Sequence, residues 1–215
     1  MDNISVDGNG FTSPIDNFNL ALNRGRGDYD RPHVFNYALV YTLPIGKGRR
    51  LAGNAPRWAD SLIGGWDLGL TSIWQSGGVV TYSSGRATGP ATINTWANYT
   101  GDRNIGAVAR QGNGVFWLTP EQISAFSFPA AGQIGSSGRN AFRGPRFFNM
   151  DMSLTKRFRL TEQHRVSFRA EAYTLLNNTN FGGLGTSLVT PASFGKLSGT
   201  VGNARIMQVA LRYDF

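Results

Sequence analysis

Five segments of the chain alternate between apolar and polar or small residues, which is the period of two that defines a β-strand with two unlike faces. One of them spans residues 204–215 (ARIMQVALRYDF), and its apolar positions fall on every second residue up to Phe215. In a soluble sheet such a face covers a core, whereas in an outer-membrane barrel it faces lipid. One strand does not distinguish a soluble sheet from a membrane barrel, so the other segments are needed to choose between them.

The remaining alternating segments lie at 33–44, 66–75, 147–158 and 165–177. They have roughly the nine to eleven residues that a tilted membrane strand needs. We therefore expect an all-β, antiparallel transmembrane β-barrel segment. The positions expected to face lipid are Phe35, Tyr37, Leu39, Tyr41, Trp66, Leu68, Trp74, Met150, Met152, Leu154 and Phe168.

The opposite faces of the same strands carry charged side chains, which favours a hydrated lumen on that side. Opposite charges on neighbouring strands can also pair across the sheet. We expect Glu171 and Arg212 to form such a pair. The positions expected to face the lumen are Asp151, Arg169, Glu171 and Arg212.

The connections between these strands differ greatly in length. Residues 159–164 form a short polar turn, 44–62 a longer connection, and 83–146 and 179–203 long glycine-rich stretches without a clear pattern. Loops of that length are unusual in a compact soluble domain but usual on the outer side of a membrane barrel. We read 1–32 as loop as well, and expect one helical turn in TPEQISAF, residues 119–126.

Composition narrows the possible functions. The 215 residues are 40% hydrophobic and only 16% charged, without a cysteine, so neither a disulfide framework nor a cysteine-ligated metal site is expected. No apolar run reaches the length of a transmembrane helix. The net charge is +8, but the basic residues are scattered and the densest cluster is GKGRR at 46–50, so a nucleic-acid partner is not expected.

No constellation of residues indicates an enzyme or a cofactor. The two histidines, His33 and His164, are far apart in the sequence, and PIGKGRR lacks the full phosphate-loop pattern. The RGD tripeptide at 26–28 is better explained as loop chemistry than as an adhesion motif. The loop aromatics Trp96, Tyr99, Phe116 and Trp117 could stack on a ligand, but packing within the loop is the stronger expectation.

Several blocks, in order, resemble one family. GDYDRPHVFNYALVYTLPIGKGRR, LIGGWDLGLTSIWQSG, FRGPRFFNMDMSLTKRFRLTEQHRVSFRAEAYTLLNNTNF and ARIMQVALRYDF look like the final part of TonB-dependent outer-membrane receptors, above all the Oar-like group. The likeness covers about residues 24–82 and 133–215. It implies energised uptake of a large ligand through a 22-stranded barrel that contains a plug domain, of which this chain would supply about the last five strands or slightly more.

The resemblance also implies partners. The barrel would contact outer-membrane lipid, and the TonB complex would act through an N-terminal part. The barrel assembly machinery would read the final strand through Phe215, Tyr213, Leu211 and Val209. The sequence shows no signal peptide, coupling box or plug, so we expect 1–215 to be a partial receptor barrel domain.

Two other interpretations stay open at this point. A secreted β-sandwich that binds carbohydrate or protein would bury its apolar faces against each other. A small complete barrel for adhesion would need at least eight strands, of which three would have to lie within 83–146.

Overall fold

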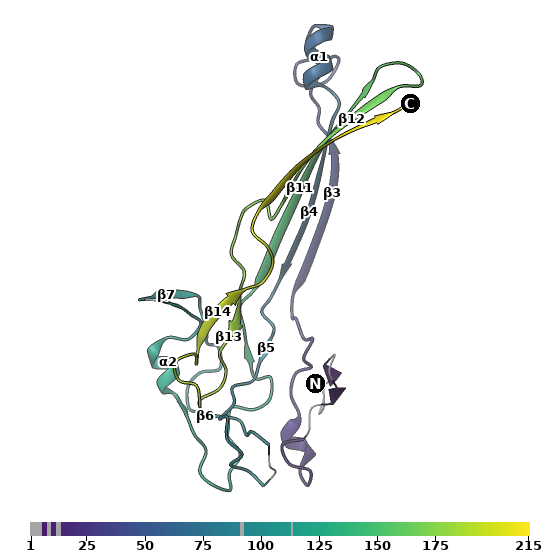
Figure 1. Ribbon diagram of the computed structural model, residues 1–215. Helices are drawn as coiled ribbons and strands as arrows, with labels where there is room; N and C mark the ends of the chain where they lie inside the picture. Colours follow the sequence, from purple (N-terminus) through teal and green to yellow (C-terminus); the bar gives the residue numbers. More distant parts are fainter. Residues whose placement is uncertain (1–5, 8–9, 12–13, 91–92, 113) are drawn as a thin grey trace. The chain divides into compact units, whose positions relative to one another are not determined.

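The computed structural model describes residues 6–7, 10–11, 14–90, 93–112 and 114–215 (Figure 1). The chain divides into two compact units. We call the first the sheet unit, which comprises Phe35–Trp74, Phe148–Thr179 and Gly202–Phe215. We call the second the loop unit, which comprises Met1–Val34, Gln75–Phe147 and Asn180–Val201.

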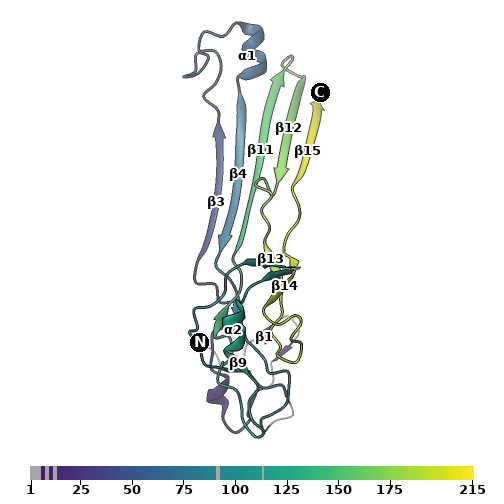
Figure 2. The ribbon, with the colours of Figure 1, turned by 90° about the vertical axis from the view of Figure 1, so that its left-hand side faces the viewer.

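The sheet unit is built on a five-stranded sheet whose order, β15-β12-β11-β4-β3, reverses the order of these strands in the chain. Neighbouring strands run in opposite directions (Figure 2), as in an up-and-down meander. All five alternating segments are therefore strands, as predicted. Their bounds are β3 Val34–Thr42, β4 Trp66–Gln75, β11 Phe147–Arg159, β12 Arg165–Tyr173 and β15 Ile206–Asp214.

The sheet is open among the described residues, because β3 and β15 each have only one neighbouring strand. The predicted total of 22 strands stays a prediction.

The connection between β3 and β4 contains a helix that the pattern did not predict, α1 (Arg57–Ile63). Asp60 fixes this connection by accepting a hydrogen bond from the backbone N–H of Lys47 at 2.5 Å.

The loop unit contains short strands and two short helical segments where the sequence predicted long patternless loops. A four-stranded sheet has the order β13-β14-β8-β7, and β6 pairs with β9 and β10 with β5. The bounds are β1 Val6–Asp7, β2 Gly10–Phe11, η1 Leu20–Asn23, β5 Val79–Val80, β6 Asn98–Tyr99, β7 Ala109–Gln111, β8 Gly114–Phe116, α2 Pro120–Ser124, β9 Phe126–Ser127, β10 Phe142–Arg143, β13 Phe181–Leu184 and β14 Lys196–Thr200.

The loop unit also has its own hydrophobic core, which explains why its long segments are folded. The rings of Tyr82 and Phe126 lie 4.7 Å apart, and those of Tyr82 and Phe142 lie 5.0 Å apart. Such aromatic pairs bury large apolar areas at one point, so they can order long connections. The buried members of the cluster are Tyr82, Ala97, Leu118, Phe126, Phe142 and Phe194.

The predicted helical turn is present as α2. Thr119 caps it: its hydroxyl accepts from the backbone N–H of Gln122, and the Gln122 side chain accepts from the backbone N–H of Thr119. This reciprocal capping satisfies two N–H groups that a helix start leaves unpaired. In the described parts of the chain, no helix has both the length and the apolarity to cross a membrane.

Candidate functional site

The two faces of the five-stranded sheet are the first functional feature. Directly paired residues of antiparallel strands point to the same face. Phe168 pairs with Leu211, and Ala170 pairs with both Val209 and Leu154. Apolar residues of three strands are thus brought onto one face, which we call the apolar face.

Contacts on β4 and β3 extend this assignment to the other edge. The rings of Trp66 and Phe168 meet edge to face at 5.9 Å, so Trp66 lies on the apolar face. Asp67 points the other way, where it accepts from the Thr42 hydroxyl at 2.7 Å and pairs with Arg157 at 3.3 Å. By alternation along each strand, the residues predicted to face lipid share the apolar face.

At the edge strand β15, no other part of the sheet unit covers the apolar face. Leu211 is 73% exposed, Val209 is 69% exposed and Met207 is 73% exposed. An exposed apolar surface of this kind normally marks contact with a partner or a membrane.

Lys156 is a charged residue on the apolar face, and the alternation did not single it out. It pairs with Phe168 in the register, yet the residue is only 3% exposed. Its ammonium group donates to the carbonyl of Gly64 and lies 5.0 Å from the Phe158 ring centre. The aliphatic stem can thus lie along the apolar face while a carbonyl and an aromatic ring hold the charge at the strand end.

The opposite face, which we call the polar face, carries ion pairs within strands. Arg169 contacts Glu171 at 2.5 Å, and Arg212 contacts Asp214 at 2.7 Å. The predicted pair between Glu171 and Arg212 is wrong. The register places Gln208 opposite Glu171, where its amide donates to the carboxylate, and Ser167 opposite Arg212.

The polar face also forms a groove. A cavity of about 390 Å³ lies there within the sheet unit, and Asp151, Arg169 and Glu171 line it. Asp151 additionally accepts from the backbone N–H of Thr174 at 2.8 Å, which fixes the end of β12. Three of the four residues predicted to line a lumen are therefore close together, and Arg212 lies farther along the polar face.

The terminal strand β15 presents the residues that the resemblance assigns to barrel assembly. Tyr213, Leu211 and Val209 lie on the apolar face, since they pair with Val166, Phe168 and Ala170. Phe215 is 91% exposed, and its ring lies 6.0 Å from that of Tyr213. A role in assembly stays a prediction.

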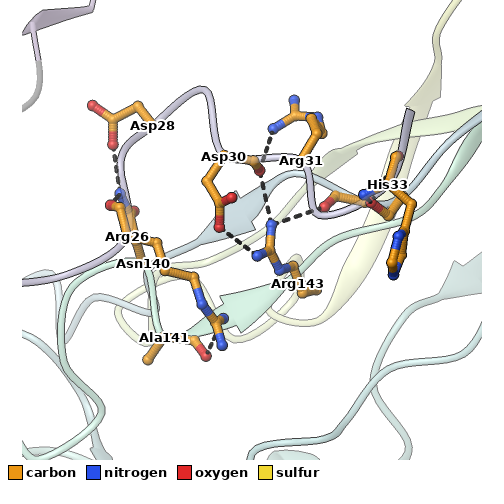
Figure 3. Close-up of polar contacts among 10 residues, drawn as sticks. Arg26, Asp28, Asp30, Arg31, His33, Asn140, Ala141 and Arg143 are labelled. Atoms are coloured by element: carbon orange, nitrogen blue, oxygen red, sulfur yellow. Dashed lines mark hydrogen bonds and ion pairs between the residues drawn. The ribbon is translucent and has the colours of Figure 1, made fainter. Parts of the chain in front are cut away.

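A second feature lies in the loop unit, where residues 26–33 meet residues 139–143 (Figure 3). Arg143 contacts the Asp30 carboxylate at 2.5 Å and donates to the Asp30 carbonyl at 2.8 Å. Asp28 accepts from the amide of Asn140 at 2.5 Å and from Arg139 at 3.3 Å. No local sequence signal could have predicted this cluster, because its partners are more than 110 residues apart.

The cluster accounts for the RGD tripeptide. The Arg26 guanidinium donates to the carbonyl of Ala141 at 3.2 Å, and Asp28 is held as described above. Both charged groups of the tripeptide therefore stabilise the loop unit, in agreement with the expected loop chemistry.

Two of the four loop aromatics pack against the core of the loop unit, as expected. Tyr99 and Trp117 lie against the hydrophobic core of the loop unit, and the Trp117 indole N–H donates to the carbonyl of Arg143 at 3.1 Å.

The two histidines have different partners. The backbone N–H of His33 donates to the Ser76 hydroxyl, whereas the His164 ring contacts the Tyr213 hydroxyl. Within the described ranges, no group of three or more His, Asp or Glu residues could hold a metal ion.

Comparison with known proteins identifies the family. No curated protein matches the chain. No solved structure matches it either. Residues 1–208 match the family described as outer membrane beta barrel domain, which gives no support to a secreted β-sandwich. The two-faced antiparallel sheet agrees with that match, and the protein belongs to the outer membrane beta barrel domain family and is located in the outer membrane.

Proposed function

We propose that this chain forms a sector of the wall of a TonB-dependent receptor, together with outer loops, and that the receptor takes up a large ligand by energised transport. The observation that carries the proposal is the open five-stranded meander with one apolar and one polar face. In lipid, the free edges of β3 and β15 would leave backbone groups unpaired at several kcal/mol each. Membrane barrels of this type have at least eight strands, which supports a larger barrel around this sheet.

The finer identification as a TonB-dependent receptor of the Oar-like group comes from the sequence blocks on β3, β4, β11, β12 and β15. On this proposal the wall has no enzymatic role and needs no cofactor. Its apolar face contacts lipid and its polar face lines the lumen. The barrel assembly machinery and the TonB complex are the proposed protein partners.

The test starts from the native cell envelope. An antibody against residues 204–215 should detect, in the outer-membrane fraction, a protein several times larger than these 215 residues. That protein, purified in detergent, should bind the periplasmic domain of the host's energy-coupling protein, and a porin from the same membrane serves as the negative control. A full-size barrel that fails to bind and instead forms a stable open channel in planar bilayers would overturn energised transport in favour of passive diffusion.

A further inference from the structure

The loop unit contains a cavity of about 550 Å³, a volume within the range of small-molecule sites. The residues that line it come from three segments that are far apart in the sequence: 22–26, 102–105 and 138–143. Most of the charged residues that line it are positive. Among the described residues, the lining has one carboxylate, Asp102, and five arginines: Arg24, Arg26, Arg103, Arg139 and Arg143.

Two of the arginines are fixed by carboxylates. The Arg139 side chain is 8% exposed and pairs with Asp28 at 3.3 Å. Arg143 pairs with Asp30 at 2.5 Å (Figure 3). Asn140 also lines the cavity; it is buried, and its side-chain amide donates a hydrogen bond to the Asp28 carboxylate. These contacts hold one wall of the cavity in place and leave the charges of the other three arginines unpaired by them.

The other three arginines have no carboxylate partner in the described part of the chain. Arg26 donates to the carbonyl of Ala141 at 3.2 Å, and Arg103 donates to the carbonyl of Ser136 at 3.3 Å. The structure shows no hydrogen bond from the Arg24 side chain to a described residue. Each guanidinium has five N–H donors, so most donors of these exposed side chains stay available to a ligand.

The balance of charge sets the ligand class. Among the described residues, the five arginines that line the cavity exceed the lining carboxylate Asp102 and the two partner carboxylates Asp28 and Asp30 by two positive charges. Guanidinium groups bind carboxylate and phosphate oxygens in a bidentate way. We propose that this cavity binds an anion with at least two negative charges on oxygen, carried by a phosphate group or by several carboxylates. The site does not depend on energised transport.

Calorimetric titration of the full protein in detergent at low salt tests the site. The probes are pyrophosphate and citrate, with chloride as the monovalent control. We expect one or both probes to bind, and the double variant Arg24→Gln/Arg103→Gln to bind about 100-fold more weakly, at about tenfold for each lost charge-assisted contact. Arg110→Gln is the matched control, because Arg110 is exposed in β7 of the loop unit and does not line the cavity.

The two probes identify the ligand chemistry. Binding of pyrophosphate alone supports a phosphate-bearing ligand, and binding of citrate alone supports a polycarboxylate. Arg24→Lys keeps the charge but loses the planar donor fork, so it should weaken binding more than Arg110→Gln does. The proposal is overturned if neither probe binds, or if Arg110→Gln weakens binding as much as the double variant, since diffuse surface charge would then explain the result.

Discussion

The phenol oxygen of Tyr213 lies 2.7 Å from Nδ1 of His164, and the two rings are stacked 3° from parallel with centroids 5.8 Å apart. His164 ends the short turn between β11 and β12, whereas Tyr213 belongs to β15. In the described sheet β15 has β12 as its only neighbour. This contact therefore attaches the terminal strand to the turn as well as to the ladder.

Tyr213→Phe should weaken that attachment, because it removes the hydroxyl and keeps the ring. One hydrogen bond between side chains contributes about 1 kcal/mol to the free energy of unfolding. Urea unfolding of the refolded protein in detergent measures the loss. Tyr41→Phe is the matched control, since Tyr41 is an exposed tyrosine of β3 on the same face. Equal losses in the two variants would contradict a specific role for His164.

Adjacent residues of β15 should respond very differently to the same substitution. Val209 lies on the apolar face, and Gln208 lies on the polar face opposite Glu171. Val209→Lys should lower the free energy of unfolding by about 2–4 kcal/mol if it lies near the bilayer midplane, because it places a charge in lipid. Gln208→Lys should be tolerated, since the new ammonium can contact the Glu171 carboxylate.

Unfolding in lipid vesicles, combined with the amount of each variant in the outer membrane, separates these outcomes. If Gln208→Lys proves as harmful as Val209→Lys, the assignment of the two faces to lipid and lumen is wrong.

Phe215→Ser should reduce the amount of protein that reaches the outer membrane without changing the thermal stability of the inserted fraction. Phe215 is 91% exposed, so the fold itself depends little on its ring. Phe18→Ser is the control, because Phe18 is 99% exposed in the loop unit. Quantitative blotting of membrane fractions gives the comparison. A normal level of Phe215→Ser would argue against recognition of this residue during assembly.

Tyr82 should make the loop unit sensitive to alkaline pH. Burial, followed by the nearby Tyr99, raises the pKa of Tyr82 above the ordinary value of about 10. The unfolded chain therefore loses this proton first, so stability is intact below pH of about 10 and falls as the pH rises above it. Tyr82→Phe should reduce that fall, as followed by near-ultraviolet circular dichroism between neutral pH and about pH 11.

At neutral pH, Tyr82→Phe should leave the free energy of unfolding unchanged. The Tyr82 hydroxyl is buried without a hydrogen-bond partner among the described residues, so its removal leaves no group unsatisfied. Phe142→Ala at the same core should instead lower the free energy of unfolding by about 3–5 kcal/mol, because it leaves a cavity. A Tyr82→Phe protein that unfolds at the same alkaline pH as the parent would exclude Tyr82 as the cause.

The sequence by itself determined the five strands of the sheet unit and their two faces. An alternating strand shows its two faces in a window of about ten residues, so Phe168 and Leu211 could be placed on one face without knowing that they pair. The capped turn at Thr119 was predictable for the same reason, since its partners lie three residues apart. The long connections carried no such local pattern.

Only the tertiary structure decided which residues meet across strands and across the loop unit. A shift of register changes every partner, so Glu171 faces Gln208 rather than Arg212, and no local pattern indicates this. The core around Tyr82 and the contact between Asp30 and Arg143 join residues that are distant in the sequence. Such contacts depend on how the whole chain packs. The two-residue periodicity therefore predicted the sheet, but no pattern in the sequence predicted the arginine-lined cavity.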